Sequence, residues 1–338
     1  MKGLKGKTVI VACGVGRDST AMLMGMHARS LRPDAILFAD VGAEKRQTYE
    51  YIPILQRWLK RAKFPPLTIV RYVPVRRTTP YRTIEGDMAM NCVLPGIVFG
   101  RGTCTNKWKI DPQNKWTKEW PLAQEAWARG EKVVKLIGYD AGETKRLAKA
   151  DAKAHAGRFQ RDRERYEVRY PLMEWGWNLQ RCLDEIAERS VPAPVKSACM
   201  FCPNQQPWEV VELLSPEERA RVMRIELAAE PYNKSIRGLW RQPRKHDGRP
   251  GSITEFILEQ GLKFMDLAKL ERKDPMPMSS HCGKYKRGYS FQPPHVGPLL
   301  SEIVKEYGYD VPDRGVCICE ELSPEEEDEF HSDLIDAL

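Results

Sequence analysis

The chain has 338 residues, of which 42% are hydrophobic and 30% charged, and its formal net charge is +8 at neutral pH. These proportions are those of a globular protein and exclude a disordered chain. No apolar run approaches the roughly 20 residues that span a membrane, so we expect no membrane-embedded segment.

The N-terminus, residues 1–7, is basic and runs directly into an apolar stretch, without the pattern of a cleavable signal. We therefore expect a cytoplasmic protein. In that compartment the nine cysteines are expected to be metal ligands, catalytic thiols or reduced core residues rather than disulfides. The positive charge is compatible with a polyanionic partner, although nucleotide substrates alone explain it.

The first unit along the chain is a strand, a glycine turn and a helix. Residues 9–12 predict a buried strand, Gly14 and Gly16 a tight turn, and residues 19–30 a helix that begins with cap-type side chains. Such a unit directs backbone N–H groups and the positive end of a helix toward one place, which suits a phosphate. The stretch is neither a Walker A loop nor G-x-G-x-x-G, and a plain structural turn is the alternative.

Three more strands are expected, a buried one at residues 35–40 and two others at 67–73 and 133–138, with helical periodicity at residues 48–62. The β-α-β-α-β succession predicts an α/β fold built on a doubly wound parallel sheet. Ligands of such sheets bind at the carboxyl ends of the strands. The turn after Gly14 and the turn after Asp40 both fall there.

The remaining segments are less regular. We expect a loop or lid at residues 78–102, a polar solvated helix at 149–169, helices at 178–189 and 252–270, a helix beginning at Ser215, and a linker at 275–294. The stretch 237–249 is basic and suits phosphate neutralisation, and its Trp240 is either a base-stacking residue or a core anchor. We place a nucleotide domain at 1–214 and a mixed, mainly helical extension at 215–338.

Cysteines supply a second signal. The sequence Cys199-Met200-Phe201-Cys202-Pro203 places two thiolates at a spacing that chelates one metal, with a redox pair as the alternative. Because no βαβ unit surrounds it, we favour the metal. Cys182 lies on the preceding predicted helix and is either a further ligand or an ordinary core residue.

The turn Gly14-Val15-Gly16-Arg17-Asp18-Ser19 resembles the Ser-Gly-Gly-Lys-Asp-Ser loop of the PP-loop pyrophosphatases, the adenine-nucleotide α-hydrolase superfamily. Gly14 stands where Ser is usual and Val15 where Gly is, and the Gly-x-Gly variant resembles the PAPS reductase-like branch. The resemblance implies a PP-loop, HUP-like sheet that binds ATP or a related adenine nucleotide. The binding residues it implies are Gly14, Val15, Gly16, Arg17, Asp18, Ser19 and Thr20, with Asp40 at the second motif.

Two later stretches are similar to the same branch. The stretch from Cys104 to Pro112 resembles the Cys-Cys-x-x-Arg-Lys-Val-x-Pro segment of the sulfonucleotide reductases, with Cys104 at the first cysteine, Lys109 at the lysine and Thr105 replacing the second cysteine. The stretch from Gly138 to Arg146 resembles the Gly-x-x-x-x-Glu-x-x-Arg motif, which includes Glu143. The resemblance implies that Arg146 contacts phosphate or sulfate, since a guanidinium suits such anions. A helix-surface ion pair is the alternative.

The resemblance also implies a metal centre. We expect it to be held by Cys104, Cys182, Cys199 and Cys202, as an iron–sulfur cluster or, alternatively, zinc. Without Cys182 the site would keep three thiolates and an open position. Mg²⁺ is a further candidate cofactor.

The expected function is that of an ATP-dependent PP-loop enzyme that adenylates a target and then transfers sulfur, with Asp18, Ser19, Lys109 and Arg146 as catalytic residues. A nucleic-acid substrate and a sulfur-donor protein are the expected partners. The first alternative is a phosphoadenylyl-sulfate reductase proper, whose terminal Glu-Cys-Gly-(Ile/Leu)-His element is matched neither at Cys282 nor at Cys317 and Cys319. The second is a non-catalytic, metal-stapled nucleic-acid-binding protein, against which the retained Asp18-Ser19 pair argues.

Overall fold

The computed structural model describes residues 4–75, 79, 81–100, 102–144, 146, 148, 164–233, 236–270 and 300–309. The chain forms two compact units. Unit 1 comprises Met1–Tyr72 and Thr105–Cys199, and unit 2 comprises Val73–Cys104 and Met200–Leu338. This division differs from the expected boundary at 214, because residues 73–104 pack with the C-terminal part of the chain.

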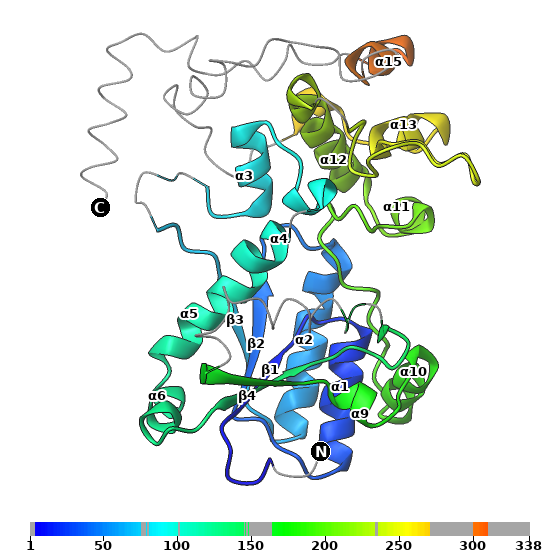
Figure 1. The fold of residues 1–338 in the computed structure, drawn as a ribbon. Helices are drawn as coiled ribbons and strands as arrows, with labels where there is room; N and C mark the ends of the chain where they lie inside the picture. The colour runs from blue at the N-terminus through cyan, green and yellow to red at the C-terminus, as the bar shows by residue number, and fades with distance from the viewer. Residues whose placement is uncertain are drawn as a thin grey trace. The chain divides into compact units, whose positions relative to one another are not determined.

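Unit 1 is built on a five-stranded, all-parallel sheet with the strand order β3-β2-β1-β4-β5 (Figure 1). The central strand β1 pairs with β2 through Val11 and Ile36 and with β4 through Val11 and Leu136. The strands are β1 (Val9–Ala12), β2 (Ala35–Asp40), β3 (Leu67–Arg71), β4 (Val133–Ile137) and β5 (Tyr166–Arg169). The expected α/β fold with a parallel sheet is confirmed.

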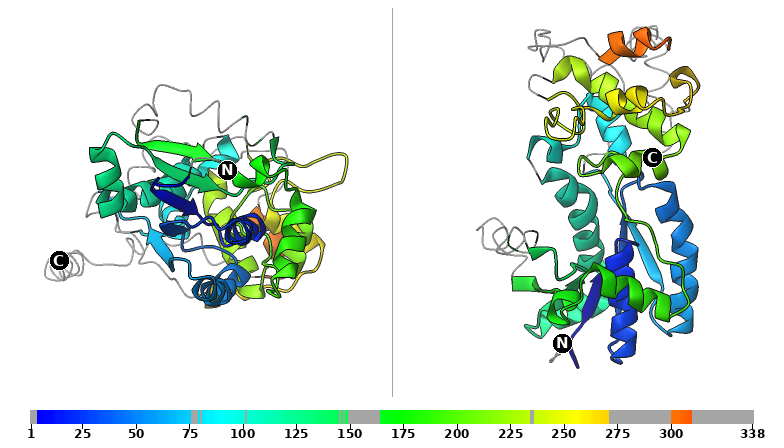
Figure 2. Two further views of the ribbon diagram at one scale, coloured as in Figure 1. Left: turned by 90° about the horizontal axis from the view of Figure 1, so that it is seen from below. Right: turned by 90° about the vertical axis from the view of Figure 1, so that its right-hand side faces the viewer.

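Helices cover both faces of this sheet (Figures 1 and 2). Because side chains alternate along a strand, β1 sends Val9 and Val11 to one face and Ile10 to the other. The first face packs against α1 (Arg17–Ala28), α2 (Arg46–Arg61) and α10 (Leu179–Glu188), and the second against α5 (Asp111–Glu119) and α6 (Pro121–Ala128). The arrangement is therefore Rossmann-like.

The edge strand β5 corrects the helix that we expected over residues 149–169. Its sequence, Tyr-Glu-Val-Arg, is polar enough to suggest a solvated helix, but it pairs in parallel with β4. Only Tyr166 is buried, against Trp127 of α6. Strand pairing and one buried aromatic decide the conformation here. Residues 149–163 lie outside the described part of the chain.

The described part of unit 2 is mainly helical. It contains α3 (Ile84–Asn91), η1 (Gly96–Phe99), α11 (Pro207–Glu212), α12 (Pro216–Ala229), η4 (Glu230–Tyr232), α13 (Ile253–Glu259), η5 (Leu267–Lys269) and α15 (Leu300–Glu306). Shorter helices near the unit boundary are α4 (Thr103–Thr105) and the π-helix η2 (Asn106–Ile110), and α9 (Pro171–Glu174) precedes α10 in unit 1. The expected helix over 252–270 is divided between α13 and η5.

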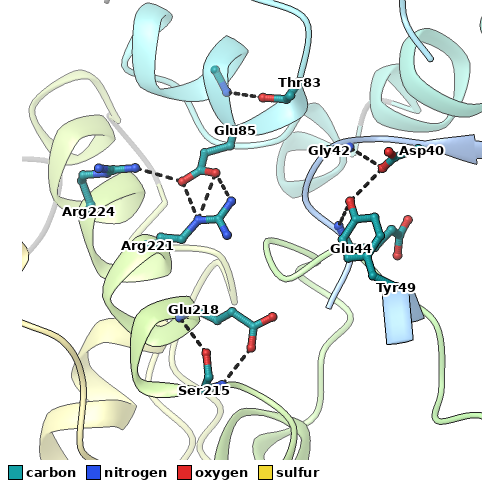
Figure 3. A network of polar contacts seen from close by, with 11 residues as sticks. Asp40, Gly42, Glu44, Tyr49, Thr83, Glu85, Ser215, Glu218, Arg221 and Arg224 are labelled. Atoms are coloured by element: carbon teal, nitrogen blue, oxygen red, sulfur yellow. Dashed lines mark hydrogen bonds and ion pairs between the residues drawn. The ribbon is translucent and has the colours of Figure 1, made fainter. Parts of the chain in front are cut away.

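Helix α3 overturns the irregular loop that we expected at residues 78–102. Thr83 begins the helix by accepting a hydrogen bond from the Gly86 N–H at 3.0 Å. The Glu85 carboxylate is buried and accepts from Arg221 and Arg224 of α12 (Figure 3). The sequence of this stretch has little hydrophobic periodicity, so it did not indicate a helix. The ion pairs of Glu85 with Arg221 and Arg224 hold α3 against α12.

The expected helix start at Ser215 is confirmed. The Ser215 hydroxyl accepts from the Glu218 N–H at 3.2 Å, and the Glu218 carboxylate accepts from the Ser215 N–H at 2.8 Å (Figure 3). This reciprocal pair is a capping box, which satisfies two otherwise unpaired donors.

The linker expected at 275–294 and the cysteines Cys282, Cys317 and Cys319 lie outside the described residues. Within the described residues, every helix is too short or too polar to cross a membrane.

Candidate functional site

Strand β1 leads into α1 through a tight turn that is held by its own side chains. Gly16 is the N-cap of α1. The Ser19 hydroxyl accepts from the Gly16 N–H at 3.2 Å and donates to the Gly16 carbonyl at 3.1 Å. Thr20 is fully buried, and its N–H donates to the Gly16 carbonyl at 3.0 Å. Ser19 and Thr20 therefore fix the turn that was expected to bind phosphate.

Val15, at the tip of this turn, has a left-handed backbone with a φ of 57°, and it is fully buried. A β-branched residue in that region costs roughly 1–2 kcal/mol, and such strain gathers at ligand-binding sites. The loop that this turn resembles carries glycine at the same place, where the cost is absent.

At two glycines, Gly16 and Gly138, the absence of a side chain allows other segments to pack closely against the turn. A Cβ atom on Gly16 would overlap the side chain of Ser197, whose own Cβ would lie 3.0 Å away. A Cβ atom on Gly138, directly after β4, would lie 3.0 Å from the Ser19 nitrogen and 3.1 Å from the Asp18 carbonyl. The end of β4 and the segment around Ser197 are thus packed directly against the start of α1.

A group of three carboxylates lies beside this turn. Asp18, Asp140 and Glu143 each offer one oxygen, and these oxygens lie within 4.8 Å of one another. Burial, and after it the charges of Glu143 and Asp140, raise the pKa of Asp18 to about 6, although the charges of Arg17 and Arg146 act in the opposite direction. Among the described residues this is the one group of three or more potential ligands so close together.

Arg146 is held beside the same group. It donates to Glu143 at 2.8 Å, and its guanidinium lies 4.2 Å from the centre of the Tyr139 ring. Tyr139 stacks on Tyr170 with 5.1 Å between the ring centres. The Glu143–Arg146 ion pair that was expected as the alternative is present, and the contact of Arg146 with phosphate or sulfate stays a prediction.

Asp40, at the end of β2, holds the following turn. One of its oxygens accepts from the Gly42 N–H at 2.8 Å and from the Tyr49 hydroxyl at 2.7 Å (Figure 3). The other accepts from Arg71 at 2.9 Å. Burial of the Tyr49 hydroxyl, its hydrogen bond to Asp40 and the Asp40 charge together raise the pKa of Tyr49. Asp40 is buried, and its contact with a nucleotide stays a prediction.

Lys109 reaches the same end of the sheet. Its ammonium donates at 3.0 Å to Glu44, whose side chain is 1% exposed. The second Glu44 oxygen is buried and has no hydrogen-bond partner among the described residues. The Glu44 backbone pairs with that of Cys199 in an antiparallel bridge.

The four predicted metal ligands are divided between the two units, with Cys182 and Cys199 in unit 1 and Cys104 and Cys202 in unit 2. Cys182 is fully buried in the apolar core between α10 and α1, where burial raises its pKa to about 12. A thiol must lose its proton to bind a metal. This environment favours packing for Cys182, and the ligand set itself stays a prediction.

Unit 1 therefore gathers most of the predicted nucleotide residues at the carboxyl ends of β1, β2 and β4. Sequence reasoning missed Asp140, Glu44 and Ser197 as members of this site. Asp140 carried a signal, because it follows a buried strand within a motif already identified. Ser197 carried none, because its contact with Gly16 joins distant parts of the chain. No protein-family model matches the chain, and no curated protein is significantly similar to it.

Proposed function

We propose that unit 1 binds an adenine nucleotide, ATP in the first instance, and acts as an enzyme of the PP-loop, PAPS reductase-like type. The observation that carries this proposal is the packing of Gly138 against the backbone of Asp18 and Ser19. It supports the assignment because two separate sequence resemblances, around Gly14 and around Gly138, converge at one end of a parallel sheet. Phosphate would bind at the N-terminal amides of α1.

Mg²⁺ suits the three carboxylates, because hard cations prefer oxygen ligands. One oxygen of Asp18 and one of Glu143 are buried and have no hydrogen-bond partner among the described residues. The mutual repulsion that raises the Asp18 pKa would be relieved by a cation. Asp18, Asp140 and Glu143 are thus the residues that would hold Mg²⁺ beside the phosphates.

The proposed reaction is adenylation of an acceptor. A nucleophile of the acceptor forms a bond to the α-phosphorus while the bond between the α-phosphorus and the bridging oxygen breaks. Pyrophosphate leaves with that electron pair, and the acceptor proton passes to water. The α1 amides, Arg146 and Lys109 are the groups of this chain that would stabilise the developing charge.

Sulfur transfer to the adenylated acceptor is the proposed second stage. A sulfide-level sulfur from the sulfur-donor protein forms a bond to the activated carbon of the acceptor while the bond from that carbon to the AMP oxygen breaks, and AMP leaves with that electron pair. The Cys199-x-x-Cys202 spacing supports a metal centre, with Cys104 as a further ligand and Cys182 as the less suitable fourth. When bound, an iron–sulfur cluster would supply or hold sulfur. Visible absorption of anaerobically purified protein near 400 nm, roughly where thiolate–iron transitions fall, would indicate a cluster.

Calorimetric titration with ATP tests the binding step. We expect wild type to bind ATP, and Asp18→Ala and Ser19→Ala to weaken binding at least several-fold. The exposed Asp184→Ala on α10 is the matched control, because it removes a carboxylate away from the turn. Unchanged affinity in both turn variants would show that the turn is only structural. Release of AMP and pyrophosphate, rather than ADP and phosphate, tests the cleavage position.

A further inference from the structure

Unit 2 carries a basic turn at residues 241–249 that the proposed nucleotide site does not use. Its backbone is closed by a hydrogen bond from the Arg244 N–H to the Arg249 carbonyl at 2.8 Å. At its base, the Arg237 N–H donates to the Arg241 carbonyl at 2.7 Å, and the Arg241 N–H donates to the Gly238 carbonyl at 2.9 Å. The basic turn is therefore a fixed structure rather than a loose loop.

Cations outnumber anions on this turn. It presents Arg241, Arg244, Lys245 and Arg249 against a single carboxylate, Asp247. Asp247 pairs with Arg244 at 2.6 Å and also accepts from the Arg249 N–H at 3.3 Å, so one carboxylate faces four cations. Burial and the neighbouring Arg244 charge both lower the pKa of Arg249. The cations of the basic turn repel one another, and an external polyanion would relieve that repulsion.

The arginines of the turn differ in the exposure of their guanidinium groups. The Nε atoms of Arg244 and Arg249 are buried and have no hydrogen-bond partner among the described residues. The Arg241 guanidinium is exposed and is fixed by a hydrogen bond to the Ile97 carbonyl at 2.7 Å. Phosphate oxygens are suitable acceptors for such guanidinium groups.

Trp240 and Arg237, which precede the turn in the sequence, are both buried. Trp240 is 2% exposed, and its indole N–H donates to the Gln205 carbonyl at 2.9 Å. The Arg249 guanidinium lies 4.7 Å from the centre of the Trp240 ring. Trp240 is thus a core anchor rather than a base-stacking residue. Arg237 is buried and bound to Glu255, so it does not belong to the exposed surface.

We propose that the basic turn binds the phosphate backbone of a nucleic acid. A protein partner is less suitable, because protein interfaces have a core of apolar and aromatic side chains. The described large apolar side chains that are exposed include none from residues 241–249. Fixed cations on a turn that itself carries no exposed large apolar side chain suit contacts that are independent of base sequence and sensitive to salt. This inference does not depend on ATP binding or turnover in unit 1.

The test is fluorescence anisotropy with a short labelled DNA duplex of random sequence and its single strand, measured over a series of salt concentrations. The variant Arg241→Gln/Lys245→Gln removes two exposed cations from the turn. The matched control, Arg57→Gln/Lys60→Gln, removes two exposed cations from α2 in unit 1. Poly-glutamate serves as the competing acidic polypeptide.

We expect the turn variant to lose about tenfold or more in affinity and to reduce the slope of log K against log salt concentration by about 2, one for each lost phosphate contact. The control is expected to retain the wild-type slope. Absence of wild-type binding, an equal loss in the control, or stronger binding of poly-glutamate than of either nucleic acid would overturn the proposal. Lys245→Glu alone, with an unchanged melting temperature, guards against a folding defect in the double variant.

Discussion

Gly16 and Ser197 are packed so closely that a Cβ atom on Gly16 would overlap the Ser197 hydroxyl. The backbone of Gly16 is extended, with a φ of −108°, so a larger residue is excluded by this neighbour and not by conformation. The turn before α1 and the segment around Ser197 are therefore fitted to each other in unit 1.

Gly16→Ala is expected to destabilise the protein by about 1–3 kcal/mol, the usual cost of overpacking, and to weaken ATP binding. Gly14→Ala is the matched control, because its Cβ would lie at an ordinary 3.5 Å from the Ser197 hydroxyl. Adding Ser197→Gly to Gly16→Ala should recover part of the lost stability. Urea unfolding measures all three variants, and equal losses at Gly14 and Gly16 would contradict the proposed fit.

Val15 gives a test in which the usual order of two substitutions reverses. Within a helix or strand, a protein with glycine at one position is normally less stable than the same protein with alanine there, by about 0.5–1 kcal/mol. At a φ of 57° alanine carries the left-handed strain and glycine does not, so Val15→Gly should be more stable than Val15→Ala by about 1 kcal/mol. The exposed Ala128 of α6, changed to glycine, should show the normal order. The normal order at Val15 as well would show that the turn is unstrained.

The pKa of Asp18 predicts a pH dependence of stability. Because burial raises it to about 6, the folded protein binds this proton more tightly than the unfolded chain does. The resulting stabilisation is fully present below about pH 4 and is lost as the pH rises to about 6.

Asp18→Asn should therefore gain stability relative to wild type between these pH values, by about 2 kcal/mol. Millimolar Mg²⁺ should narrow that difference at pH 7 by stabilising wild type alone. Melting temperatures over a pH series, with and without Mg²⁺, measure both effects. A difference between the two proteins that does not change with pH would contradict the assignment.

Glu226 organises the start of α13 in unit 2. Its carboxylate is fully buried and accepts from the N–H groups of Leu239, Ile253 and Thr254 and from the Thr254 hydroxyl, at 2.6–3.0 Å. Glu226→Gln would direct an amide N–H₂ group at these donors, so we expect a loss of about 2–4 kcal/mol. The exposed Glu212→Gln is the control, expected within about 0.5 kcal/mol of wild type. Chemical denaturation separates the two, and a small loss at Glu226 would contradict its role.

The ion pairs of Glu85 test how burial changes the contribution of an ion pair to the free energy of unfolding. It accepts from Arg221 and Arg224 within unit 2, where both the Arg221 and Glu85 side chains are buried. Glu85→Gln leaves the buried Arg221 charge uncompensated, and we expect a loss of about 3–5 kcal/mol. Glu50→Gln breaks the exposed Arg46–Glu50 pair and should cost about 0.5 kcal/mol or less. Similar losses in the two variants, measured by urea unfolding, would show that the Glu85 charge is not needed.

The sequence was sufficient to predict the elements with strong periodicity. The apolar runs that became β1, β2, β3 and β4 were all identified as strands. Strands β1, β2 and β4 are buried on both faces, as is usual in parallel sheets, whereas the edge strand β3 buries only Leu67 and Val70. The capping residue Ser215 likewise predicted the start of α12. Strand β5 and helix α3 were missed, because the pairing of Tyr166 with Val133 and the ion pairs of Glu85 are tertiary contacts that the local sequence does not carry.

The candidate site was predictable only where one motif contained its residues. Ser19 and Glu143 were named from sequence, and they lie at the turn before α1 and in the carboxylate group beside it. Glu44 was missed, because its pairing with Lys109 and its backbone bridge to Cys199 join three distant segments. Such contacts follow from the fold and not from residue spacing.

The central claim is that ATP binds at the start of α1, and hydrogen–deuterium exchange with and without ATP tests it most directly. We expect ATP to slow exchange in the peptides that contain Gly14–Thr20 and Gly138–Glu143, because a bound nucleotide stabilises these segments against local opening. Peptides from α6 serve as the internal reference and should not change. ATP binding without protection of the turn at Gly14, or protection confined to unit 2, would contradict the account.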